Sequence, residues 1–136
     1  MNGETDISKL IESMEPMLNK GEYVFTTLTL PIEIERKDIV CEFKEVEGVT
    51  IVIEKGKAKE LNLYFDYVAS WITLQVHSSL HAVGLTAFFS TALAKAGISC
   101  NVISGYYHDH IFVDIKNTRQ AMKILQALPS QNNSTK

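Results

Sequence analysis

The chain has 136 residues, of which 46% are hydrophobic and 21% charged, a balance typical of a soluble globular protein that can bury a core as one domain or two very small ones. A formal net charge of −3 provides no basic footprint, so nucleic acid is excluded as the expected partner. No apolar run reaches the roughly 18 residues of a membrane span, and the N-terminal ten residues are polar, so we expect a cytoplasmic protein without a membrane anchor or a targeting segment.

The first half of the chain predicts one helix followed by strands. Residues 6–19 have an apolar helical face, and Pro16 should kink this helix or end it early. The charges of residues 55–61 are interpreted as the solvated face of a short helix. The elements expected before it are a strand over 22–30 and a hairpin over 40–46 and 49–54 that turns at Glu47-Gly48.

The second half begins with a cleanly alternating strand over residues 70–77. Ile72 and Leu74 point to one face, and Trp71 and Thr73 point to the other. Trp71 is interpreted as packing on that far face, with a ligand platform as the alternative. A hairpin over 99–106 and 110–116 follows, then a last helix from Asn117 that Pro129 should end and a disordered tail over 130–136.

Between these strands, residues 84–96 predict a helix of unusual neutrality. Leu85, Phe89 and Leu93 lie on its apolar face, whereas its opposite face carries small residues. From Ser78 to Gly105 the only formal charge is Lys95. A helix without a charged solvent face favours a second partner, which could be another domain, another subunit or a ligand-bearing loop.

The predicted fold class is α+β. The second half has the order β-α-β-β-α, which lacks only a last strand for a ferredoxin-like unit with helices on one face of an antiparallel sheet. The first half is interpreted as a shortened version of the same unit or as a source of strands for the second sheet. We therefore expect tandem units over residues 1–68, including the leading helix, and 69–129.

Several sequence motifs carry a resemblance to a known family. Gly84 opens the central helix, and Leu93-Ala94-Lys95-Ala96-Gly97-Ile98 closes it, which resembles the ACT domain family of small regulatory ligand-binding modules. The wider set GEYVF at 21–25, EGVTIVIEK at 47–55, VHSSL at 76–80, AVGLTA at 82–87 and GYYHDHIFV at 105–113 resembles short bacterial ACT-containing proteins that are functionally uncharacterised. The second half resembles, more distantly, the ACT units of animal cytosolic arginine sensors.

The resemblance implies that a small molecule, often an amino acid, binds in the loop after the first strand and along the second strand, usually at a dimer interface. Carried over by position, the candidate ligand-binding residues are Ser78, Ser79, Leu80, His81, Ala82, Val83, Gly84, Asn101 and Val102. Many loops of this family hold the ligand's ammonium with an acidic residue, but this loop has none. Asp109 would have to reach the ligand, or the ligand is not a simple amino acid.

The backbone chemistry agrees with this placement. A helix N-terminus offers unpaired N–H groups with positive dipole character, and Gly84 lets a carboxylate approach the backbone closely. We therefore expect a non-catalytic regulatory or sensor protein that binds an amino acid as a homodimer, without a cofactor. A structural module whose neutral helix face docks another protein is the alternative.

Two enzymatic readings are weaker. His108-Asp109-His110, with His77 or His81, could bind a metal, but His108-Asp109 is also typical of a hairpin turn. Ser78 or Ser79 with His81 and Asp109 could form a nucleophile, base and orienter, yet no nucleophile-elbow pattern surrounds either serine. Cys41 and Cys100 lie in apolar strand patterns and are interpreted as buried, reduced thiols.

Overall fold

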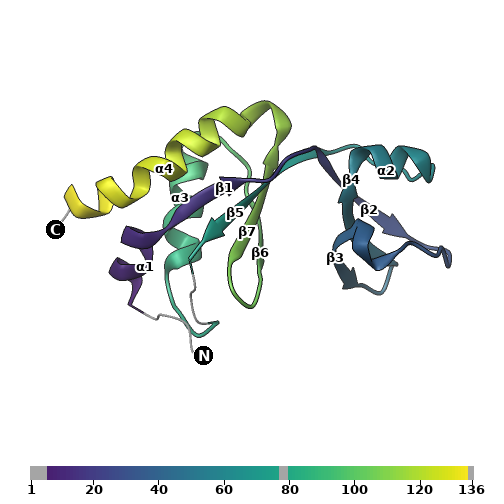
Figure 1. Ribbon diagram of the computed structural model, residues 1–136, viewed down its shortest axis with the longest axis horizontal. Helices are drawn as coiled ribbons and strands as arrows, with labels where there is room; N and C mark the ends of the chain where they lie inside the picture. Colours follow the sequence, from purple (N-terminus) through teal and green to yellow (C-terminus); the bar gives the residue numbers. More distant parts are fainter. Residues whose placement is uncertain (1–5, 77–79, 135–136) are drawn as a thin grey trace.

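The computed structural model describes residues 6–76 and 80–134 and contains two lobes joined by strands (Figure 1). The larger lobe consists of α1 (Ile7–Ser13), β1 (Glu15–Leu18), β5 (Val68–Gln75), α3 (Leu85–Lys95), β6 (Asn101–Ser104), β7 (Asp109–Asp114), the short 3-10 helix η2 (Ile115–Asn117) and α4 (Thr118–Ser134). The smaller lobe consists of β2 (Tyr23–Leu28), the 3-10 helix η1 (Arg36–Asp38), β3 (Ile39–Lys44), β4 (Val49–Glu54) and α2 (Lys55–Glu60).

Strand β5 belongs to both lobes of one antiparallel sheet, whose order is β3-β4-β2-β5-β7-β6. The first residues of β5 pair with β2 (Tyr23 opposite Ala69), and its later residues pair with β1 (Pro16 opposite Leu74). In the larger lobe β1 therefore provides the strand that the predicted β-α-β-β-α unit lacked. In the smaller lobe η1 stands where a first helix would be, so that unit is indeed shortened, and the α+β ferredoxin-like tandem is confirmed.

The core of the larger lobe lies between its sheet and its three α-helices. Ile72 and Leu74 of β5 are fully buried against Phe89 of α3 and Leu125 of α4, which confirms the predicted alternation of β5 and the apolar face of α3. Leu10 of α1 lies in the same cluster. The leading helix thus packs in the larger lobe, while the predicted boundary after residue 68 stays a prediction.

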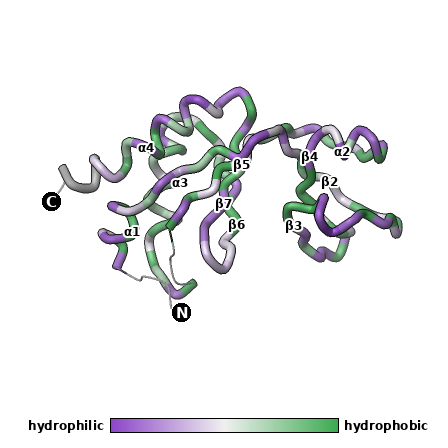
Figure 2. Tube along the Cα trace, in the orientation of Figure 1, coloured by the Kyte–Doolittle hydropathy of each residue, from purple (hydrophilic) through white to green (hydrophobic). Residues whose placement is uncertain are grey.

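The opposite face of this sheet is covered by the smaller lobe. Phe112 of β7 packs with Tyr23 of β2 and Val52 of β4, and Trp71 packs at the edge of this cluster. Figure 2 shows β4 as a hydrophobic strand, in keeping with Ile51 and Val52, which are both fully buried. The far face, on which the sequence predicted that Trp71 packs, is therefore covered by the N-terminal half of the same chain.

Two helices end away from their predicted limits. The helix expected over 6–19 ends at Ser13, which confirms that Pro16 ends it early, because the residue before Pro16 disfavours helical backbone and residues 15–18 pair with β5 instead. Pro16 is tolerated there because β1 is an edge strand. At the other end, α4 continues through Pro129 to Ser134. Residues 130–134, predicted as part of a disordered tail, are thus helical, whereas residues 135–136 lie outside the described residues. Leu128, in the turn before the proline, is buried.

Candidate ligand-binding site

Helix α3 begins directly after Gly84, as the sequence predicted. Gly84 is the N-cap, with a left-handed φ of +99° and ψ of −14°, and its carbonyl accepts the Phe88 N–H at 3.0 Å. Having no side chain, Gly84 makes no capping hydrogen bond to the amides of the first turn. Gly84, Thr86 and Ala87 are all exposed, so this side of the first turn is open to solvent.

A groove of about 680 Å³ begins at Gly84 and follows the outer side of α3 against α4. Its lining is mostly apolar or small: Gly84, Ala87, Phe88, Thr91, Ala92, Lys95, Ala96, Ile124 and Leu128. The α4 residues of this groove were not among the predicted site residues. The signal that could have found the groove is the small-residue face of α3, which predicts that this side of the helix has a partner.

The predicted loop residues divide into described and undescribed ones. Ser78 and Ser79 lie outside the described residues, as does His77. Leu80 and Val83 are 68% and 85% exposed, Ala82 packs at the border of the larger core, and His81 is exposed. A loop that presents leucine and valine side chains to solvent is available for contact with a ligand or with another chain.

Asp109 lies on the helix-facing side of the sheet, at the end nearest the loop. It is the first residue of β7, is 6% exposed and stands opposite Leu74, near the end of β5. Asp109 shares its face with Ile111, which packs in the larger core. Asp109 is therefore the acidic side chain that the topology brings to the same end and face of the sheet as the start of α3.

Of the two predicted residues of β6, only Val102 shares the helix-facing side. Val102 stands opposite Ile111 and packs against the larger core. Asn101 stands opposite Phe112, which faces the smaller lobe, so the Asn101 side chain lies on the other side of the sheet. There it lowers the pKa of Tyr67, which burial and Asp114 raise more strongly. Within one chain Asn101 does not converge with Gly84.

The segment from Gly105 to His110 forms a turn rather than a metal cluster. The Gly105 N–H donates to the His108 carbonyl at 2.9 Å, as the turn interpretation expects. Asp109 and His110 point to opposite faces of β7, and the His110 Nδ1 accepts from Trp71 Nε1 at 3.1 Å. Over residues 6–76 and 80–134, no three His, Cys, Asp or Glu side chains are grouped so that they could hold a metal ion.

Neither thiol has the environment of a reactive cysteine. Cys41 and Cys100 are free, half-buried thiols. Burial raises the pKa of both, that of Cys100 to about 11, so both stay protonated at neutral pH. They behave as the small hydrophobic side chains that the sequence predicted.

The comparison with family models identifies the two halves. One model of the ACT domain matches residues 2–70, and another matches residues 67–127. The chain belongs to the ACT domain family. Both matched regions are therefore ACT domains, and domains of this family commonly have a regulatory role. No helix in the described part of the chain is long and apolar enough to cross a membrane.

Solved structures agree with this assignment. The ACT protein is 43% identical to a protein of unknown function from Vibrio cholerae, described as a possible transport protein, over 92% of this chain and 97% of that one, with a TM-score of 0.77. The ligand-free regulatory subunit of aspartate kinase from Thermus thermophilus has a TM-score of 0.59 at 8% identity, over 83% of this chain and 95% of that one. This second likeness concerns the fold alone. The comparison with curated proteins gave no match.

Proposed function

We propose that this ACT protein is a cytoplasmic regulatory or sensor protein that binds a small molecule, an amino acid in the first instance, at the start of α3 and has no catalytic activity of its own. The observation that carries the proposal is the exposed, left-handed Gly84 at the head of a groove of about 680 Å³. A ligand carboxylate placed there would accept hydrogen bonds from first-turn amides and would meet the positive end of the helix dipole.

Asp109 is the proposed partner of the ligand's ammonium group. Its position opposite Leu74 and its low exposure of 6% support this role, because a buried carboxylate forms stronger ion pairs than a fully hydrated one. The proposed site is completed by one strand residue, Val102, and by six loop residues: Ser78, Ser79, Leu80, His81, Ala82 and Val83. Asn101 could join such a site only from a second chain.

Calorimetry against the twenty amino acids, with thermal unfolding in parallel, tests the proposal. A ligand present at 100 times its Kd should stabilise the protein by about 2.7 kcal/mol. If Asp109 holds the ammonium, Asp109→Asn should weaken an amino acid about tenfold and leave its deaminated analogue unaffected. The absence of both heat and thermal shift at millimolar ligand would refute binding, and equal loss for amino acid and analogue would refute the role of Asp109.

The groove between α3 and α4 supports a homodimer as the assembled form. Phe88, Ala92 and Ile124 line it and pack only partly against the core, so a second copy laid across it would bury them. Sedimentation of the wild type and of Thr91→Arg, which places a charge in the groove, tests this. The dimer should dissociate on substitution while the fold is retained, and a wild-type monomer at micromolar concentration would refute it.

The same groove favours the second candidate function, in which the chain is a module that docks a different protein. That function predicts a monomer whose groove is filled only in a hetero-complex and a loop that binds no amino acid. The calorimetric and sedimentation experiments separate the two candidates, because a ligand-binding dimer and a ligand-free monomer give opposite results in both.

A further inference from the structure

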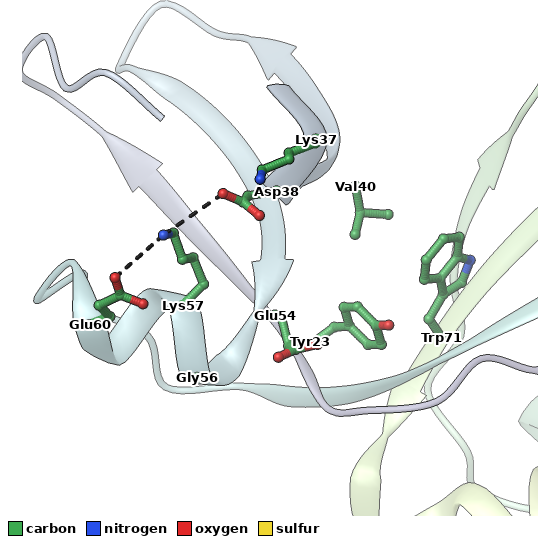
Figure 3. A pocket seen from close by; sticks show the side chains of 9 residues that line it. All are labelled: Tyr23, Lys37, Asp38, Val40, Glu54, Gly56, Lys57, Glu60 and Trp71. Carbon is green, nitrogen blue, oxygen red and sulfur yellow. Dashed lines mark hydrogen bonds and ion pairs between the residues drawn. The ribbon is translucent and has the colours of Figure 1, made fainter. Parts of the chain in front are cut away.

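A second hollow lies between the two lobes, on the side of the sheet away from α3. It has a volume of about 420 Å³, and Figure 3 shows its lining side chains converging from both lobes. The lining residues are Tyr23, Lys37, Asp38, Val40, Glu54, Gly56, Lys57, Glu60 and Trp71. We call this hollow the interlobe cleft. It shares no lining residue with the groove at Gly84.

One wall of the interlobe cleft is aromatic. The rings of Tyr23 and Trp71 meet edge to face, with centroids 5.4 Å apart, and Trp71 stacks on Phe112. Their polar atoms are already used, because the Tyr23 hydroxyl donates to the Lys20 carbonyl at 2.7 Å and the Trp71 Nε1 donates to His110. What this wall offers to a guest is therefore ring surface rather than hydrogen-bonding groups.

The charged side chains of the opposite wall are not equivalent. The Lys57 ammonium lies 3.4 Å from Glu60 and 3.8 Å from Asp38, so its charge is compensated by two carboxylates. Glu54 has no ion pair within residues 6–76 and 80–134, and its charge contributes to raising the pKa of Tyr23, which burial raises most. Lys37, which also lines the cleft, lies 3.4 Å from Glu35. Among the described residues, Glu54 is thus the charged lining group without an ion pair, and it lies next to an aromatic wall.

Behind the aromatic wall lies a smaller apolar cavity of about 210 Å³. It shares Val40 and Trp71 with the interlobe cleft, and its other lining residues are Cys41, Ile103, Gly105, His110 and Phe112. The two hollows therefore adjoin at Val40 and Trp71, which gives the cleft an apolar side suited to a ligand with an apolar body and a charged head. Its body would lie against Trp71 and Val40, and its head would face Glu54.

We propose that the interlobe cleft is a second binding site of this ACT protein and that it takes a small organic amine, with its ammonium group paired to Glu54 and its apolar body against Tyr23 and Trp71. An ammonium group is attracted both by a carboxylate and by the faces of Tyr and Trp rings. An anion of the same shape would be repelled by Glu54 and would gain little from Lys57 and Lys37, because both ammonium groups already lie next to carboxylates. This site goes beyond the function proposed for the start of α3 and does not depend on it.

The chain carries a built-in reporter for this site, because Trp71 is its only tryptophan. The experiment titrates the full chain at low salt with 2-phenylethylamine and, separately, with 3-phenylpropionate, an anion of similar shape, and follows the emission of Trp71. The amine should give a saturable change at millimolar concentration, and the anion should bind at least about tenfold more weakly. Calorimetry confirms that the optical change reports binding.

Matched variants locate the charge that recognises the amine. Glu54→Gln removes the uncompensated carboxylate and should weaken the amine about tenfold, which corresponds to about 1.4 kcal/mol. Glu60→Gln removes a carboxylate that is already paired with Lys57 and should change the affinity less than about twofold. Gly84→Ala should leave amine binding unchanged, whatever it does to binding of an amino acid.

Three results would overturn the proposal. They are the absence of a saturable change with the amine, equal affinity for amine and anion, and an unaltered affinity in Glu54→Gln whose unfolding midpoint equals that of the wild type. A loss of amino-acid binding with retained amine binding would instead bear on the start of α3 alone.

Discussion

Gly84 and Gly97 lie at the two ends of α3. Comparing the stability of alanine variants at these two positions tests whether the start of the helix is free of packing contacts. Both have left-handed backbone, with φ of +99° and +74°. A Cβ on Gly84 would meet the Ile7 Cδ1 at 3.9 Å, an ordinary contact, and a Cβ on Gly97 would meet no atom within 4 Å. Alanine at either position should therefore cost only backbone strain. That strain destabilises the folded chain by about 1–2 kcal/mol. The reduced entropy of the unfolded chain offsets up to about 1 kcal/mol of this loss.

The net expectation is a loss of about 1 kcal/mol in unfolding free energy for Gly84→Ala and for Gly97→Ala, or about 4 °C in Tm for a chain of this size. Urea titration of the two variants beside the wild type measures it. A cost for Gly84→Ala that exceeds that of Gly97→Ala by about 3 kcal/mol, as a tightly packed site would give, would refute the conclusion that the start of α3 is open. With a bound amino acid, the ligand-induced rise in Tm should shrink in Gly84→Ala and persist in Gly97→Ala.

Three further predictions concern other parts of the chain. Gly48→Ala should lower the unfolding free energy by at least about 2 kcal/mol, because its Cβ would lie 2.7 Å from Thr27 Oγ1 and 2.8 Å from the Leu28 carbonyl oxygen. An unchanged unfolding free energy in urea titration would contradict this close packing of the turn between β3 and β4 against β2. Burial lowers the pKa of His110 from its usual 6.5, so as the pH falls the unfolded chain binds a proton before the folded chain does. The unfolding free energy should therefore decrease as the pH drops below about 6.5, and His110→Asn should make it less dependent on pH. A short iodoacetamide pulse at pH 8, read by mass spectrometry, should modify Cys100 far more slowly in the folded protein than in urea, because its pKa is raised to about 11, and equal rates would refute its burial.

The elements predicted correctly are those whose signal is local. Strand β5 was found because Ile72 and Leu74 alternate with polar or far-face residues, and both are fully buried. Helix α3 was found because its apolar residues recur with helical spacing, and Leu85 and Phe89 are buried as that spacing requires. Gly84 was placed at the opening of this helix by the resemblance to the ACT family, whereas its left-handed φ of +99° is visible only in the structure.

The elements predicted wrongly are those decided by distant pairing. Residues 14–18 continue the apolar spacing of α1, yet they form an extended segment and β1, because β5 offers an unpaired edge that the local sequence does not reveal. The dipeptide Glu15-Pro16 is the local signal that favours the strand. The short charged helix α2 was predicted correctly, and Lys59 and Glu60 are exposed. The local sequence does not reveal that Lys57 and Glu60 also line the interlobe cleft, because Trp71 joins that cleft only in the folded chain.

The pairing of β1 with β5 bears on the order in which the molecule can form. Pro16 lies opposite Leu74, so the smaller lobe is nested inside the larger one, between two strands that must meet. During synthesis α1 and β1 leave the ribosome first but lack their partners until β5 and the helices after it have emerged, whereas β2, β3, β4 and α2 can assemble at once. The smaller lobe should therefore fold before the larger one. Its folding brings β1 and β5, which flank it in the sequence, close together, and this lowers the entropy cost of pairing them.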